Sequence, residues 1–182
     1  ETGTQLMFLE NCCYDRETMA VLGMLRDNLF GTPLHATCGY RHSSWGSRSW
    51  IDYRSNDRDN IHWRNQHYLN RNADLYPTHG IGPVANWFNI NRGNCFLYLT
   101  SVATKTKGIY DYIESHPEGG ANHPNAKLEW KQGDIVTTVI KTSKEETIII
   151  NFELNLPRPY SRDYSINGTK GLWSGEYMRR GI

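Results

Sequence analysis

Two runs of β-branched residues in the second half of the chain place the strongest constraint on its fold. Residues 135–141 and 147–154 are dominated by Ile, Val and Thr, and a short polar segment, 142–146, separates them. This spacing predicts an antiparallel hairpin, because β-branched side chains favour strands and a short polar connection reverses the chain. A lone hairpin is unstable in water, so the remaining sequence must supply further strands and a layer that covers them.

Periodicity locates the further strands. Alternating apolar residues predict a strand at 34–40, which would place Tyr40 on the same face as His42. A second strand is predicted at 95–102. A second hairpin is predicted at 164–173, turning at Asn167-Gly168.

Helical spacing is found in three places. Residues 15–30 read as an amphipathic helix that starts at an N-cap aspartate and stops before a glycine. A helix is also expected from about Pro83, since proline at a first helical position costs no hydrogen bond, and a short one at 109–114. Residues 43–74 are polar and lack a period, so a long loop is expected there. This order of elements favours an α+β domain with an antiparallel sheet.

Composition excludes several classes of protein. The 182 residues suit one domain, and 20 Lys+Arg against 19 Asp+Glu give a net charge of +1, so neither nucleic acid nor a membrane surface is an expected partner. No apolar run approaches the roughly 18 residues of a membrane span. The four cysteines show no C-x-x-C spacing, so neither a zinc site nor a disulfide framework is expected, no metal is predicted, and the compartment stays open.

The densest chemical cluster is the string LYPTHGIGP at 75–83. Tyr76 and His79 lie three residues apart beside a helix N-terminus, where the positive end of the helix dipole disfavours an imidazolium ion. A neutral histidine can act as a base, although a local capping histidine is an equally common alternative. Residues 80–85 also match G-x-G-x-x-A, but no strand precedes them and Pro83 stands where N–H groups should face phosphate, so a dinucleotide site is rejected.

Three other positions could contribute to a site. Glu10 ends a short apolar run, and residues at strand ends often line ligand crevices. Arg158, Tyr160 and Arg162 would share one side of an extended segment, which suits either an anionic ligand or, as spacing alone favours, a solvated edge. Arg64 follows a tryptophan and could contact a sugar or lie exposed. No pair of catalytic carboxylates of the ordinary glycosidase kind is identifiable.

Several strings in their order resemble the Gfo/Idh/MocA superfamily, and within it are most similar to glycoside hydrolase family 109, the NAD-dependent α-N-acetylgalactosaminidases. The similarity covers nearly the whole chain. The strings that carry it are LENCCYD (9–15), NLFGTPLHATCGYRH (28–42), HWR (62–64), LYPTHGIGPVANWFNINRGN (75–94), GDIVTTVIKT (133–142) and PRPYSR…NGTKG (157–171).

The resemblance implies a two-domain enzyme. An N-terminal Rossmann domain would hold NAD, and a C-terminal α+β domain, an open and mainly antiparallel sheet with helices on one face, would supply the substrate site. Residues 1–10 would then be a remnant of the last Rossmann strand, and 11–182 the substrate-binding and oligomerisation domain. Superfamily members pair through the sheet face, so a homo-oligomer is expected, and the isolated fragment is expected to be inactive.

The resemblance also assigns residues and chemistry. In the family, NAD⁺ first takes hydride from sugar C3. The C2 proton is then lost and the glycosidic oxygen leaves. Water adds at C1, and the hydride returns to the sugar. Tyr76 and His79 would handle protons in this scheme. The residues that would bind and position the carbohydrate substrate are Glu10, Tyr40, Arg64 and Tyr160.

Two other functions remain open at this point. One is a net sugar oxidoreductase of the same superfamily, which would release NADH in proportion to substrate. The other is a non-catalytic sugar-binding or assembly domain, for the fragment as isolated.

Overall fold

The computed structural model describes residues 2–5, 7, 9–43 and 63–175, with the side chains of Trp63 and Arg64 outside this set. Its centre is a six-stranded sheet with the order β2-β3-β4-β1-β5-β6. The strands are β1 (Pro33–Arg41), β2 (Phe96–Ala103), β3 (Ile135–Thr142), β4 (Thr147–Glu153), β5 (Ser165–Gly168) and β6 (Leu172–Ser174).

The sheet is mixed. The two predicted hairpins are present as the antiparallel pairs β3–β4 and β5–β6, and β2 pairs antiparallel to β3. β1 enters the middle of the sheet, parallel to β4 with Cys38 opposite Ile150, and antiparallel to β5. The predicted class, an open and mainly antiparallel α+β sheet, is therefore confirmed, with one parallel pair added.

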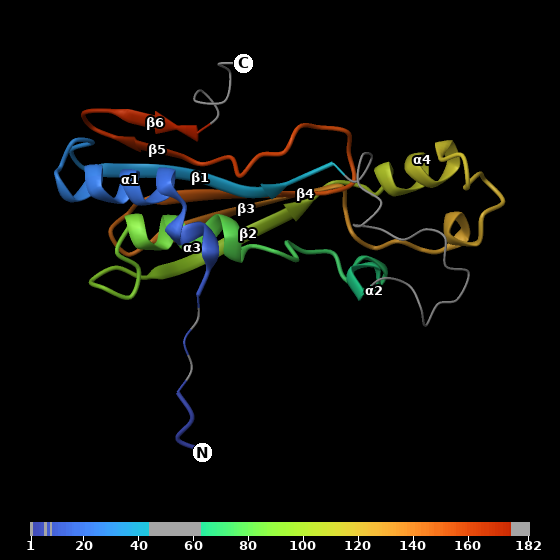
Figure 1. Ribbon diagram of the computed structural model, residues 1–182, viewed down its shortest axis with the longest axis horizontal. Coiled ribbons are helices and arrows are strands. Elements are labelled where there is room, and N and C mark those ends of the chain that lie inside the picture. Colours follow the sequence, from blue (N-terminus) through green and yellow to red (C-terminus); the bar gives the residue numbers. More distant parts are fainter. Residues whose placement is uncertain (1, 6, 8, 44–62, 176–182) are drawn as a thin grey trace.

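The helices occupy one face and one end of the sheet (Figure 1). α1 and α3 lie against β1 on one face, whereas α2 and α4 lie beyond the carboxyl ends of β1 and β4. None of the helices among the described residues is long and apolar enough to cross a membrane. The helices are η1 (Asn11–Tyr14), α1 (Arg16–Arg26), α2 (Trp63–Asn70), α3 (Thr78–Trp87), α4 (Gly108–Ser115) and η2 (Pro124–Lys127).

Two apolar clusters form the core. The first joins α1 and α3 to the covered face of the sheet and includes Val21, Val84 and Ile166, each fully buried. The second joins α2 and α4 to the ends of β1 and β4 and includes Ile109 and Phe152. Each such side chain contributes about 1.5–3 kcal/mol through burial, so both clusters stabilise the fold.

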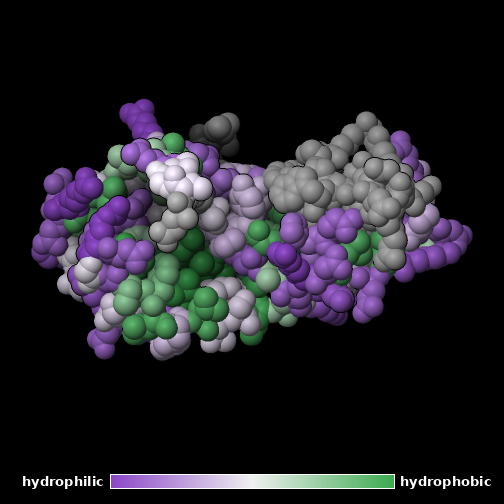
Figure 2. All heavy atoms as spheres, turned by 90° about the horizontal axis from the view of Figure 1, so that it is seen from below, coloured by the Kyte–Doolittle hydropathy of each residue, from purple (hydrophilic) through white to green (hydrophobic). Residues whose placement is uncertain are grey.

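The other face of the sheet is open. Every residue of β2 is exposed, and the apolar side chains there include Leu97, Tyr98 and Val102, with Val139 beside them on β3. Figure 2, seen from the side of the sheet that ends in β2, shows hydrophobic side chains gathered along this edge. A contiguous exposed apolar surface of this kind is typical of an interaction site.

Several sequence predictions need correction. The predicted loop at 43–74 contains α2; residues 44–62 lie outside the described set. α2 has little amphipathic signal of its own, and its buried side chains, Tyr68 and Leu69, pack into the second core cluster. The helix predicted at 15–30 ends at Arg26, because Asn28 has a φ of 57° that no helix allows.

The last hairpin does not turn where it was expected. Asn167 and Gly168 belong to β5, and the Gly168 N–H donates to the carbonyl of Gly171, 2.8 Å away. Gly168 is required for a different reason, since a Cβ there would lie 2.2 Å from the Phe30 carbonyl oxygen. The described residues among 2–10 form neither helix nor strand, and the assignment of 1–10 to a Rossmann domain stays a prediction.

Candidate active site

Tyr76 and His79 lie together, as their spacing predicts. Their ring centroids are 4.7 Å apart and the rings meet edge to face. α3 begins at Thr78, five residues earlier than predicted, so His79 is in its first turn and Pro83 is inside the helix. The pair thus spans the start of α3, where the helix dipole favours negative charge.

Pro83 explains how the backbone of His79 is fixed. A proline has no N–H, so the His79 carbonyl, four residues earlier, loses its partner within the helix. The Tyr164 hydroxyl donates a hydrogen bond to this carbonyl instead. α3 also approaches β1 closely at Gly80, where a Cβ would lie 3.1 Å from the Gly39 nitrogen. The histidine is therefore held by the sheet as well as by its own helix.

Glu10 is the direct partner of His79. Its Oε1 lies 2.5 Å from His79 Nδ1 and also accepts the Cys12 N–H at 3.1 Å. Burial opposes ionisation of Glu10, but the Cys12 N–H and His79 outweigh it and lower the pKa of this carboxyl below its ordinary value. A carboxylate needs a proton on Nδ1, which leaves Nε2 of a neutral His79 with its lone pair free. A Cβ on Gly82 would lie 2.8 Å from Glu10 Cγ, so only glycine leaves room here.

Tyr40 connects this pair to the sheet. Its ring lies 4.6 Å from the Tyr76 ring and 5.6 Å from the His79 ring, measured between centroids. It comes from β1 and is 4% exposed. His42, on the same face as predicted, lies 4.5 Å from Tyr40 with the two rings tilted by 37°, and it meets Tyr160 edge to face at 4.4 Å.

The six predicted residues therefore divide into three groups. Glu10, Tyr40, Tyr76 and His79 form one contiguous cluster. Tyr160 is 42% exposed and contacts His42, which in turn contacts Tyr40 of this cluster. Arg64 is the second residue of α2, but its side chain lies outside the described set. The roles assigned to all six stay predictions.

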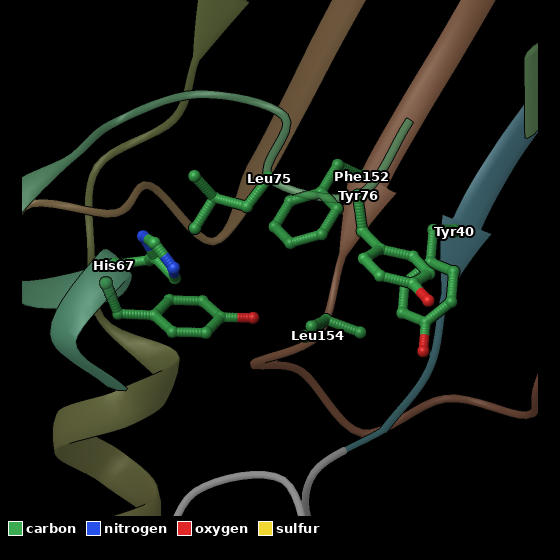
Figure 3. Close-up of a pocket in the computed structure, with 7 residues that line it drawn as sticks. Tyr40, His67, Leu75, Tyr76, Phe152 and Leu154 are labelled. Carbon is green, nitrogen blue, oxygen red and sulfur yellow. The ribbon is translucent and has the colours of Figure 1, made fainter. Parts of the chain in front are cut away.

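A small pocket lies beside the cluster (Figure 3). Its volume is about 20 Å³, enough for roughly one water molecule. Figure 3 shows the hydroxyl groups of Tyr40 and Tyr76 on the same side of the pocket, where both can face one ligand. The pocket is lined by Tyr40, His67, Tyr68, Leu75, Tyr76, Phe152 and Leu154.

An ion-pair network holds the segment that carries Tyr160. Arg158 Nη1 lies 2.6 Å from Glu153 Oε2, and Arg41 binds the same carboxylate at 2.8 Å. Arg41 also pairs with Asp163 at 2.5 Å. The favoured interpretation of Arg158 as a solvated edge residue is thus wrong, because its side chain is 15% exposed and paired.

Sequence reasoning missed Asp74 and left Arg162 as a solvated residue. Asp74 Oδ1 accepts the Tyr76 N–H at 3.0 Å and so fixes the turn before α3. Arg162 Cζ lies 4.5 Å from the centroid of the Tyr40 ring and 5.0 Å from that of Tyr160. The alternation of Arg158, Tyr160 and Arg162 was the available signal, but the aromatic partner on β1 is distant in sequence.

Among the described residues, one group could offer three metal ligands. Oxygen, sulfur and nitrogen atoms of Glu10, Cys12 and His79 lie within 4.8 Å of one another. The carboxylate and imidazole are in direct hydrogen-bond contact, and burial raises the pKa of Cys12 to about 11. This geometry is that of a hydrogen-bonded pair beside a protonated thiol, and the prediction of no metal stays a prediction.

Comparison with solved structures defines the class of the fold. The chain resembles scyllo-inositol dehydrogenase from Lactobacillus casei (TM-score 0.57, 10% identity, 93% of this chain and 42% of that one). It also resembles myo-inositol dehydrogenase from Corynebacterium glutamicum (TM-score 0.56, 12% identity, 89% and 38%). The fold is that of the C-terminal domain of Gfo/Idh/MocA enzymes, as the sequence predicts.

Sequence comparison then identifies the family. Residues 14–180 match the family "Glycosyl hydrolase 109, C-terminal domain", and the chain belongs to this family. It is 46% identical to an alpha-N-acetylgalactosaminidase of Tannerella forsythia and 43% identical to a glycosyl hydrolase family 109 protein of Parabacteroides distasonis. Each alignment covers 96% of this chain and 40% of the relative, so the chain spans less than half the length of these proteins.

Proposed function

We propose that this chain is the substrate domain of an NAD-dependent enzyme that hydrolyses α-N-acetylgalactosaminides by an oxidation, elimination, addition and reduction sequence. The observation that carries the proposal is the contact between Glu10 and His79. It commits the one carboxylate of the cluster to orienting a histidine. The cluster is therefore suited to proton transfer by His79 and Tyr76 and not to an acid and nucleophile pair of carboxylates.

The residues of this chain would divide the work as follows. His79 Nε2 accepts a proton from the sugar, while Glu10 holds the Nδ1 proton and stabilises the imidazolium that forms. Tyr76 lies against the same imidazole and exchanges a proton with a sugar hydroxyl group. Tyr40 and Tyr160 supply apolar faces and hydroxyl groups that orient the ring of the carbohydrate.

NAD supplies reversible hydride transfer when it is bound. This chain fits only part of its site. The G-x-G-x-x-A string at 80–85 lies inside α3 and does not follow a strand, so it forms no phosphate-binding turn. The buried guanidinium donors of Arg162, and Glu10 beside the start of α3, are suited to polar groups at the nicotinamide end. We therefore expect a separate Rossmann domain to bind most of the dinucleotide.

Deuterium exchange tests the proposal with the intact protein that contains this domain. Hydrolysis of an aryl α-N-acetylgalactosaminide in D₂O with NAD⁺ should place deuterium at sugar C2, because the C2 proton is removed and replaced. His79→Asn and Tyr76→Phe should abolish both hydrolysis and exchange, whereas His116→Asn, a control at the end of α4, should keep both. Hydrolysis without C2 exchange would refute the proposal, and NADH accumulating in proportion to substrate would favour a net sugar oxidoreductase.

We also propose that the open face of the sheet pairs with a second copy of this chain. The apolar side chains of β2 and Val139 support this, since an exposed edge with these residues would otherwise invite aggregation. The isolated domain is expected to assemble without catalysing the reaction.

A further inference from the structure

Arg162 differs from Arg41 and Arg158 because no carboxylate among the described residues forms an ion pair with it. Its Nε and Nη1 atoms are buried, and no acceptor among the described residues lies within hydrogen-bond reach of them. Two of the carboxylates nearby have other partners: Asp163 binds Arg41, and Glu10 binds His79. Buried donors of this kind are rare in folded proteins and indicate a missing acceptor.

The guanidinium is nevertheless held firmly. Its Cζ lies over the rings of Tyr40 and Tyr160, and these cation–π contacts compensate in part for the water it has lost. The residue before it, Ser161, exchanges backbone hydrogen bonds of 3.1 and 2.9 Å with Arg41 on β1. The side chain is thus fixed against two rings of the candidate site by a paired backbone.

We propose that Arg162 is a ligand-binding residue whose free N–H groups donate to an amide carbonyl oxygen. This inference rests on the proposed function, which offers two such oxygens. One belongs to the acetamido group of the sugar, and the other to the carboxamide of the nicotinamide.

The surroundings of Arg162 favour a neutral acceptor over an anion. A pocket of about 50 Å³ is lined by Arg162 and Tyr160 together with three acidic residues, Asp15, Glu17 and Asp163. A phosphate or carboxylate entering there would meet three carboxylates as well as the guanidinium. An uncharged carbonyl accepts the same hydrogen bonds without that repulsion, and its dipole suits guanidinium N–H groups that no carboxylate binds directly.

The test compares Arg162→Met and Arg162→Lys with the unmodified intact enzyme, and uses Arg92→Met as a matched control. Arg92 is exposed, and its side chain hydrogen-bonds only to Asn86 among the described residues. Two quantities are measured: NAD⁺ affinity by calorimetry, and kcat/KM on an aryl α-N-acetylgalactosaminide and on the matched α-galactoside, which lacks the acetamido group.

We expect Arg162→Met to lose about 10- to 100-fold in one of these quantities, as for a hydrogen bond to a charged group. If the acceptor is the acetamido group, kcat/KM falls only on the acetamido sugar and selectivity over the galactoside collapses. If it is the nicotinamide carboxamide, NAD⁺ affinity falls and both sugars are affected equally. In either case, added guanidinium ion should restore part of the activity of Arg162→Ala, which a structural role would not allow.

Two results would overturn the inference. One is unchanged NAD⁺ affinity and unchanged sugar selectivity in Arg162→Met. The other is an equal loss on both sugars at unchanged NAD⁺ affinity, with a lower Tm and no rescue by guanidinium. Failure of the unmodified enzyme to hydrolyse either sugar would instead refute the proposed function. In that case the NAD⁺ affinity of Arg162→Met would still show whether Arg162 binds the nicotinamide carboxamide.

Discussion

Ionisation of the Asp74 carboxyl group should lower the stability of this domain as the pH rises. A paired carboxylate has the opposite effect. Its Oδ1 accepts the Tyr76 N–H, but its Oδ2 is buried and has no hydrogen-bond partner among the described residues. Burial raises the pKa of Asp74 from 3.8 to about 6, although the Tyr76 N–H acts in the opposite sense. The folded state therefore holds the Asp74 proton more tightly than the unfolded chain does.

The size of the effect follows from the two pKa values. A shift of about two units at about 1.4 kcal/mol each gives about 3 kcal/mol of lost stability above pH 6, where Asp74 is ionised in both states. Near pH 5 the folded state keeps most of its proton while the unfolded chain has lost it, and about half of this cost remains. Below the unfolded value of 3.8 the cost vanishes.

Urea unfolding of the purified chain and of Asp74→Asn tests this reasoning. The Asn variant keeps the acceptor for the Tyr76 N–H and removes the charge, so it should be more stable by about 3 kcal/mol near pH 7.5 and by about half of that near pH 5. Asp27→Asn, at the exposed end of α1, is the control and should show no such trend. A difference that is the same at both pH values would refute the argument, because an unpaired buried carboxylate must titrate.

Three further predictions concern the sheet, the histidine and the open face. Gly39→Ala places a Cβ 2.4 Å from the Asn151 carbonyl oxygen and should lower the free energy of unfolding by about 1–3 kcal/mol. Calorimetry should then show a Tm lower by several degrees. An unchanged Tm would mean that β1 and β4 move apart at this point without loss of stability. Glu10→Gln removes the carboxylate that orients His79, so kcat/KM of the intact enzyme should fall by about 10-fold or more, and an unchanged kcat/KM would show that Glu10 does not position this histidine. Tyr98→Asp on the exposed β2 strand should shift the isolated domain toward monomer in sedimentation velocity, whereas unaltered assembly would place the interface elsewhere.

The sheet was the most predictable part of the molecule because its signals are local. The β-branched runs that form β3 and β4 are separated by a short turn, and alternation alone fixes the face of Tyr40 on β1. The position of β1 between β4 and β5 follows from no local pattern. α2 was missed for the same reason, since its stability comes from the packing of Tyr68 and Leu69 into a core assembled from distant segments.

The candidate site was predictable only where its residues are close in sequence. Tyr76 and His79 are three positions apart and were found from spacing. Glu10 and His79 are 69 positions apart, and only the resemblance to a family linked them. The contact of Arg162 with Tyr40 joins the segment before β5 to β1, so the periodicity that placed Arg162 on an extended segment could not show what it faces.

The arrangement of glycine and proline in α3 links the fold to the proposed chemistry. Gly80 lets the helix approach β1, Gly82 leaves room for Glu10, and Pro83 frees the His79 carbonyl for Tyr164. Each of these residues weakens an isolated helix, so α3 depends on the sheet for its stability. The position of His79 is therefore determined by contacts with β1, Glu10 and Tyr164 together, and a histidine held in this way can keep its Nε2 aimed at a ligand throughout a multistep reaction.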